Sequence, residues 1–178
     1  MRSAADSPAP VITTARLVLR GHTAADLDHT AAMWADLAAT RFIGGRPSSR
    51  EDAWARLLRY VGHWSLLGFG YWLIEARAGG QFVGEAGFGD FKRDLEPGFA
   101  GALEAGWIVT PSEQGKGYAS EAVEAALGWA AGHLPGRRSV CMIAPDNAAS
   151  LRVARKCGYA EYARASYKGE PTLLFERG

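Results

Sequence analysis

The sequence predicts a mixed α/β (α+β) domain with one central, mostly antiparallel sheet. Strand-like and helix-like segments follow one another in the order β-α-α-β-β-β-α-β-α-β-β, which is a meander with one crossover and not a repeating βαβ array. The 178 residues are 48% hydrophobic and 22% charged, which is a globular composition with enough chain for one core. We expect about six or seven strands, about four helices, a flexible tail over residues 1–10 and a single domain over 11–178.

The first third of the chain contains one strand and two helices. Residues 14–20 alternate apolar and polar side chains, as a half-buried strand does. Thr23, with Asp26 three residues later, predicts a helix start, and apolar side chains continue at helical spacing over 27–37. The Gly-Gly-Arg-Pro sequence at 44–47 ends this helix.

A second helix and three strands follow. Ser48 and Glu51 predict a capping box for this helix, which ends near Gly68. The strands are expected over 71–76, 81–91 and 103–110, with Gly79-Gly80 as a hairpin turn and a polar loop before the third strand.

The C-terminal third alternates helix and strand before a closing hairpin. The predicted elements are a helix over 118–134, a strand over 139–143, a short helix from a cap at Asp146 or Asn147 to Lys156, and hairpin strands over 159–166 and 172–175. The strand at Leu103, its helix and the strand at Ser139 form one crossover unit, so these two strands should be parallel.

Composition excludes several classes of function. The net charge of +1 gives no general attraction to nucleic acid or to an anionic membrane. The two cysteines, Cys141 and Cys157, show no metal-ligand spacing, so no metal site is predicted. Residues 1–10 lack the apolar core of a signal peptide, and no stretch reaches membrane-spanning length, so we expect a cytoplasmic protein.

Residues 114–119, Gln-Gly-Lys-Gly-Tyr-Ala, lie between a predicted strand and a predicted helix. Amides at a helix N-terminus point outward without partners, and glycines allow a phosphate to approach the backbone, so this segment predicts an anion site. It is not a P-loop, because Gly117 follows Lys116 where the P-loop has Ser or Thr. It is not a dinucleotide-binding turn either, because Ser120 occupies the place of the third Gly or Ala.

The segment fits the pattern Gln/Arg-x-x-Gly-x-Gly/Ala and so resembles the pyrophosphate loop of the GNAT superfamily of acetyl-CoA-dependent N-acetyltransferases. Further similarity lies elsewhere, especially to the branch that contains the RimJ/RimL-like N-terminal acetyltransferases of ribosomal proteins. The similar stretches are the opening strand at 14–20, Leu-Glu-Ala-Gly-Trp at 103–107, Gln114 to Ala122, and Asn147 to Ser150 with Lys156 to Tyr159. The resemblance covers about Ala15 to Phe175.

The resemblance implies a GNAT fold, in which the strand at Leu103 and the strand at Ser139 splay apart and acetyl-CoA lies between them. The backbone of one strand would then pair with the pantetheine arm, the loop amides would hold the pyrophosphate, and an Asn side chain would bind a pantetheine amide. The cofactor contacts implied in this way are Ile108, Val109, Gln114, Gly115, Lys116, Gly117, Tyr118, Ala119, Asn147 and Lys156.

Attack of an amine on a thioester needs a base, because the acceptor is an ammonium ion at neutral pH. The resemblance places Glu104 in this role, and a solvated strand residue is its alternative interpretation. Glu85 and Asp90 on the neighbouring strand are reserve candidates, and His63 is a weaker one.

Many relatives carry a tyrosine as general acid seven residues after the asparagine, but this chain has Ala154 there. In the resembling branch a serine takes the role, which implies Ser150; its alternative is a helix first-turn hydroxyl. A backbone N–H near Trp107 or Ile108 would stabilise the oxyanion. Cys157, at a helix C-terminus, is interpreted as a packing residue.

The acceptor stays open between a protein N-terminus, a small amine and an aminoglycoside-like antibiotic. Its pocket should involve the first two helices, the turn at 68–71 and the last hairpin. Expected partners are acetyl-CoA and this amine, without nucleic acid or membrane, in a monomer or a homodimer. The alternative hypothesis is an inactive acyl-CoA-binding module, which could dispense with Glu104 and Ser150.

Overall fold

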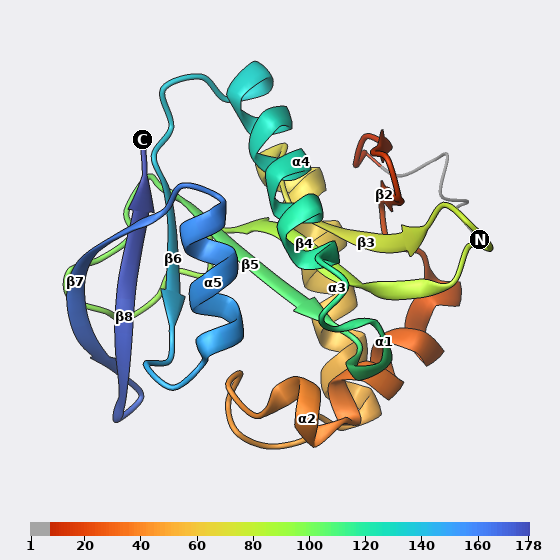
Figure 1. Ribbon diagram of the computed structural model, residues 1–178, viewed down its shortest axis with the longest axis horizontal. Coiled ribbons are helices and arrows are strands. Elements are labelled where there is room, and N and C mark those ends of the chain that lie inside the picture. Colours follow the sequence, from red (N-terminus) through yellow and green to blue (C-terminus); the bar gives the residue numbers. More distant parts are fainter. Residues whose placement is uncertain (1–7) are drawn as a thin grey trace.

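The computed structural model describes residues 8–178, and residues 1–7 of the predicted tail lie outside the described residues. Eight strands form one sheet in the order β1-β2-β3-β4-β5-β6-β8-β7 (Figure 1). The strands are β1 (Ile12–Thr13), β2 (Leu17–Arg20), β3 (Tyr71–Ala76), β4 (Phe82–Gly89), β5 (Leu103–Val109), β6 (Ser139–Ile143), β7 (Ala160–Tyr167) and β8 (Glu170–Arg177).

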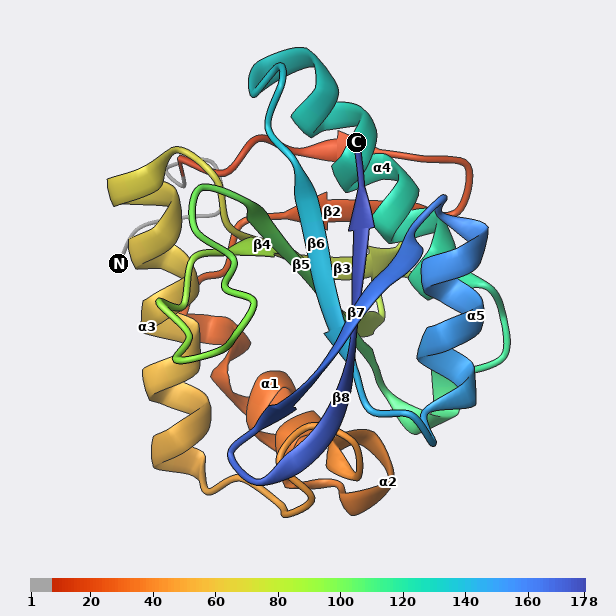
Figure 2. The ribbon, with the colours of Figure 1, turned by 90° about the vertical axis from the view of Figure 1, so that its left-hand side faces the viewer.

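Helices cover both faces of this sheet. They are α1 (Leu27–Ala35), α2 (Leu37–Thr40), α3 (Arg50–Leu67), α4 (Tyr118–His133) and α5 (Ala148–Lys156), with short 3-10 turns η2 (Ala24–Asp26) and η3 (Pro111–Glu113). Figure 2 shows α4 and α5 on one face and α1 and α3 on the other. No described helix is both long enough and apolar enough to span a bilayer.

The predicted fold class is confirmed, with small differences in the elements. The first predicted helix is divided because Asp36 is extended (φ −82°, ψ 120°) and its side chain caps α2 by accepting from the Ala38 amide at 2.7 Å. The predicted cap at Ser48 is wrong: Ser49 and Asp52 form the capping box of α3. Ser48 is committed elsewhere, because its amide donates to the Trp34 carbonyl at 2.8 Å.

The packed body also begins earlier than residue 11. Ala9 is buried in the core, and the Pro10 carbonyl accepts a hydrogen bond from Trp72 Nε1 at 2.8 Å. These contacts place the end of the predicted tail inside the domain. The two-residue strand β1, which the sequence analysis did not predict, follows directly and raises the strand count to eight.

The functional region begins where β5 and β6 diverge. These two strands are parallel, as predicted, and their ladder contains two residue pairs, Leu103 with Ser139 and Glu104 with Val140. In contrast, β4 and β5 pair over six positions as an antiparallel ladder. Within the described chain, residues 105–109 of β5 therefore have no strand partner on the β6 side.

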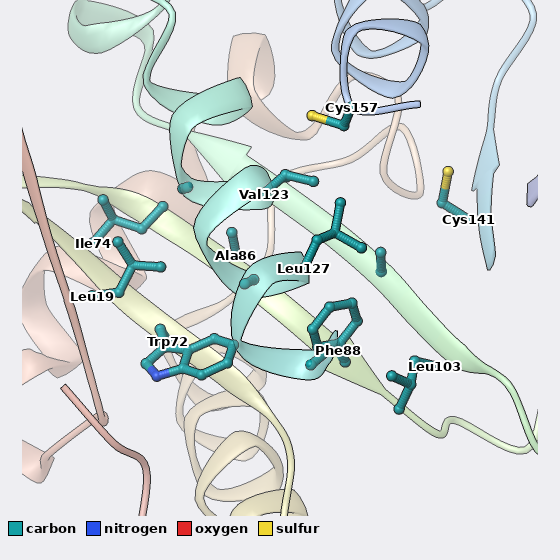
Figure 3. Close-up of a cluster of buried hydrophobic side chains, with 14 of the residues drawn as sticks. Leu19, Trp72, Ile74, Ala86, Phe88, Leu103, Val123, Leu127, Cys141 and Cys157 are labelled. Carbon is teal, nitrogen blue, oxygen red and sulfur yellow. The ribbon is translucent and has the colours of Figure 1, made fainter. Parts of the chain in front are cut away.

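The main core lies between α4 and the sheet (Figure 3). One face of α4 carries apolar side chains at helical spacing, and they are buried: Ala122, Val123, Ala126, Leu127 and Ala130. They pack against side chains that project from the central strands, among them Trp72, Phe88 and Leu103. This packing fixes the N-terminus of α4 relative to the open edge of β5, because one rigid helix spans both features.

Candidate active site

The loop at 114–119 has the backbone of an anion-binding turn. Gly115 and Gly117 have φ values of +77° and +82°, a conformation that glycine adopts without strain. Gln114 ties the loop to the end of β5, since its Nε2 donates to the Val109 carbonyl at 3.0 Å. Among the described residues, the six amides of 115–120 find no backbone acceptor. They lie at the positive end of α4, so the loop offers an anion a row of free donors.

An ion pair that the sequence analysis missed supports this loop from behind. Arg16 donates from Nη1 to the Lys116 carbonyl at 2.8 Å and from Nε to Glu121 at 2.7 Å. Glu121 also accepts from the Thr14 hydroxyl at 2.6 Å. Burial opposes ionisation of Glu121, but the bonds from Thr14 and Arg16 outweigh it and lower its pKa. The predicted strand over 14–20 begins only at Leu17, and the turn between β1 and β2 therefore anchors the first turn of α4.

The Lys116 side chain forms an ion pair with Glu113. Its Nζ lies 2.9 Å from Glu113 Oε2, and 48% of its side chain is exposed. An exposed pair of this kind contributes little to stability. Lys116 can therefore exchange Glu113 for another anion near the loop at small cost.

Three of the predicted residues, Asn147, Ser150 and Lys156, lie on α5 or at its N-cap. Asn147 caps the helix, and its Oδ1 accepts from the Ser150 amide at 3.0 Å, so its NH₂ group is the part that can donate to a ligand. Ser150 is half-buried in the first turn. Lys156 is exposed at the last position of α5. The neighbouring Cys157 contacts the Ser120 carbonyl at 3.7 Å, which places this end of α5 against the first turn of α4.

Glu104 lies at the divergence of β5 and β6 and is buried, with 5% of its surface exposed. Arg93, from the loop after β4, donates from Nε to both carboxylate oxygens at 2.8 Å. Burial is the largest influence and raises the pKa of Glu104, while the hydrogen bonds and charge of Arg93 oppose that rise. The alternative interpretation of Glu104 as a solvated strand residue is wrong. A buried carboxylate with a raised pKa at a strand opening has the properties of a general base.

The reserve candidates have other environments. Glu85 is fully buried and accepts from Trp34 Nε1 at 3.0 Å and from the Thr30 hydroxyl at 3.2 Å. Asp90 pairs with Lys92 at 2.6 Å, and that bond is the largest influence that lowers its pKa. His63 is buried, and its Nε2 lies 3.2 Å from the Asp90 carbonyl and 3.3 Å from the Asp90 amide, so it packs against backbone.

Tyr71 reaches the middle of β5 from the same face as Glu104. A Cβ placed on Gly106 would lie 2.0 Å from the Tyr71 hydroxyl, so the hydroxyl occupies the space that a side chain would fill. The Tyr71 ring stacks on Tyr60 with centroids 4.4 Å apart. Burial is the main cause that raises the pKa of Tyr71 well above its usual value, which keeps this hydroxyl protonated.

Neither cysteine has an activated thiol. Cys141 and Cys157 are both buried, and burial is the main cause that raises their pKa values, that of Cys157 to about 11. The packing interpretation of Cys157 fits this environment. In the part of the chain that the structure describes, no three His, Cys, Asp or Glu side chains gather as a metal site would require.

The splayed strands, the loop of free amides and the buried acid agree with one family. The sequence matches the family model described as an acetyltransferase (GNAT) domain over residues 16–160. The chain belongs to the GNAT acetyltransferase family. Members of this family transfer acetyl groups from acetyl-CoA, and the predicted family resemblance is confirmed.

Similar proteins support the same assignment. A structure from Bordetella pertussis assigned to the GnaT family of acetyltransferases is 34% identical over 95% of this chain and 99% of that chain, with a TM-score of 0.84. RimL, a ribosomal L7/L12 α-N-protein acetyltransferase solved in complex with coenzyme A, matches 94% of this chain and 97% of that chain with a TM-score of 0.76. At 18% identity, the likeness to RimL shows the fold alone. The Bacillus subtilis protein YkkB is 29% identical over 111 residues, which is 62% of each chain.

Proposed function

We propose that this GNAT protein transfers the acetyl group of acetyl-CoA to a primary amine by direct attack. The observation that carries the proposal is the row of free amides at residues 115–120, placed at the open end of the split between β5 and β6. A pyrophosphate at these amides directs the pantetheine arm along the unpaired edge of β5. The thioester then lies near Glu104, where the two strands part.

Several predicted contacts follow from this placement. The backbone of Ile108 and Val109 pairs with the pantetheine arm, because no described strand satisfies that edge. Amides from Gly115 to Ala119 hold the pyrophosphate. The Asn147 NH₂ group donates to a pantetheine carbonyl, while its Oδ1 keeps α5 capped. Lys116 and Lys156 add positive charge near the phosphates.

Glu104 accepts the proton of the acceptor amine, directly or through a water, and the neutral amine attacks the thioester carbonyl. A free backbone N–H near Trp107 or Ile108 stabilises the oxyanion. The C–S bond then breaks, and the leaving thiolate needs little acid assistance because a thiol has a pKa near 8.5. Ser150, in the first turn of α5, is the candidate donor of a proton to this sulfur.

Acetyl-CoA binding is tested first, by thermal melts with and without cofactor. A ligand at one hundred times its dissociation constant stabilises a protein by about 2.7 kcal/mol, so a clear shift in melting temperature is expected. Gly117→Asp should abolish this shift, because it places a negative charge where the pyrophosphate binds. Gly136→Asp is the matched control, since Gly136 has a similar φ of +76° and open surroundings beyond the other end of α4.

Turnover is then measured as free-thiol release from acetyl-CoA with a panel of acceptors. Peptides with free N-termini, small primary amines and aminoglycosides represent the open substrate classes. Release that depends on one class identifies the acceptor. A parent protein that shows no thermal shift with millimolar acetyl-CoA would contradict the proposal.

A further inference from the structure

The Arg93 side chain joins three segments that are distant in the sequence. It extends from the loop after β4 and bonds Glu104 on β5 through Nε at 2.8 Å and through Nη2 at 2.5 Å. Its Nη1 donates to the Tyr167 hydroxyl, at the end of β7, at 3.0 Å. The guanidinium carbon also lies 4.8 Å from the Phe91 ring centroid and 5.0 Å from that of Tyr167. Arg93 thus couples the candidate base to the hairpin expected to line the acceptor pocket.

We infer that Arg93 is a positioning residue for acetyl transfer, which holds the Glu104 carboxylate in place and charged, and that Tyr167 holds Arg93. The inference rests on the proposed function, in which Glu104 is the base. Burial favours a neutral carboxylic acid, and a neutral acid cannot accept a proton from the amine. A guanidinium bound to both oxygens favours the charged form and fixes the plane of the carboxylate.

The other titratable groups near Glu104 do not replace Arg93. They are Asp90 beside the same loop, His63 on α3, Tyr71 on β3 and Cys141 on β6. Asp90 repels a charged Glu104, and His63 bonds the Asp90 backbone instead. Burial raises the pKa values of Tyr71 and Cys141, so both stay neutral at neutral pH. Among the described residues, Arg93 is therefore the cation that directly contacts Glu104.

The contact still leaves Glu104 able to act as a base. Of the three bonds from Arg93, two reach Oε1 and one reaches Oε2. Each carboxylate oxygen can accept about two hydrogen bonds. One acceptor position on Oε2 thus remains for a water or for the amine, while Arg93 keeps the group oriented.

The test is the pH dependence of kcat/KM for Arg93→Gln, Arg93→Lys and Tyr167→Phe. Arg93→Gln should move the acid limb to higher pH and lower the rate at pH 7 by about 10-fold or more, with the loss shrinking as pH rises. Arg93→Lys keeps the charge but not the fork, so it should fall between the parent and Arg93→Gln. Tyr167→Phe keeps the ring and loses one bond, and it should have the smallest effect of the three.

Arg164→Gln is the matched control. It breaks an exposed pair with Glu161 on the same hairpin and should leave the pH profile unchanged. Because Arg93 acts through Glu104, Arg93→Gln should slow a Glu104→Gln protein no further. Acetyl-CoA should stabilise every variant as it stabilises the parent.

A rate loss that is equal at every pH would overturn the inference, and so would losses that multiply in the Arg93→Gln, Glu104→Gln double variant. Arg93 would then have only a structural role. If Arg93→Gln fails to fold, the acid limbs of the pH profiles of Arg93→Lys and Tyr167→Phe test the inference in the same way. Failure of the proposed function is separate, because the parent itself would then show neither cofactor binding nor turnover.

Discussion

Two buried carboxylates on neighbouring strands face the same side of the sheet but have opposite surroundings. Glu85 on β4 is opposite Ile108 of β5 and is enclosed by Trp34 and Thr30 of α1, with His22 Nε2 at 3.3 Å. Glu104 on β5 lies at the divergence from β6 and is paired with Arg93. Both are charged residues in the interior, yet only Glu104 borders a break in the sheet.

The comparison shows that burial alone does not identify a base. The donors around Glu85 come from α1 and from the segment after β2, so this carboxylate fixes α1 against the sheet and has no surface open to a substrate. Glu104 is held by Arg93 from the loop after β4, at the point where β5 and β6 part, and Arg93 in turn contacts Tyr167 of the last hairpin. Its place at the break between β5 and β6 is what separates Glu104, as a candidate catalytic carboxylate, from the structural Glu85.

The largest effect is expected for Glu104→Gln. It should lower kcat about 10²–10⁴-fold, the usual contribution of a general base. The shift with acetyl-CoA should persist, because the proposed cofactor site is at the loop amides and not at Glu104. In the parent, the rate should rise with pH through the raised pKa of Glu104, since the protonated carboxyl accepts no proton. The variant should lose this limb; a kcat and a pH profile equal to those of the parent would remove Glu104 from the mechanism.

Glu85→Gln should change stability instead of chemistry. The new NH₂ group would replace one of the two oxygens that accept from Trp34 Nε1 and from the Thr30 hydroxyl, and a buried donor that loses its acceptor costs about 1–3 kcal/mol. Denaturant unfolding should show this loss, with kcat of the folded protein within about 3-fold of the parent. A large fall in kcat at unchanged stability would reverse the roles of the two carboxylates.

Gly106→Ala tests the middle of β5, between Glu104 and Ile108, the residue opposite Glu85. Its new Cβ would lie 2.0 Å from the Tyr71 hydroxyl, and Tyr71 cannot easily move because it stacks on Tyr60. We expect overpacking to lower the free energy of unfolding by about 1–2 kcal/mol and to raise the KM for the amine. Gly128→Ala on α4 is the control, because nothing lies within 4 Å of its Cβ; it should be neutral or stabilising. Equal behaviour of the two variants would contradict the close approach of Tyr71.

The smallest effect is expected for replacing both cysteines by alanine. Burial raises the pKa values of Cys141 and Cys157, so neither supplies a thiolate at neutral pH. Turnover should stay within about 2-fold of the parent once stability is compared, because direct transfer needs no thiol nucleophile. An acetyl group trapped on either cysteine would instead indicate a ping-pong route and would displace Glu104 from the first chemical step.

Local chemistry in the sequence was enough to predict the glycine turn at 114–119 and the elements around it. The loop at 114–119, the apolar face of α4 and the parallel strands around it follow from turn residues, helical periodicity and crossover rules, which act over a few neighbouring positions. The same rules placed the cap of α3 at Ser48, whereas Ser49 caps the helix. Both fit a capping box, and the contact of Ser48 with Trp34 decided the choice.

Only the tertiary structure decided which carboxylate is enclosed by α1 and which lies at the break in the sheet beside Arg93. The bond from Arg93 to Tyr167 joins residues 74 positions apart, and the bond from Trp34 to Glu85 joins residues 51 positions apart. No periodicity or turn signal encodes such pairs, because side chains at these separations meet only after the sheet has formed. The sequence therefore determined the fold and the turn before α4, while long-range packing determined which partners each buried carboxylate has.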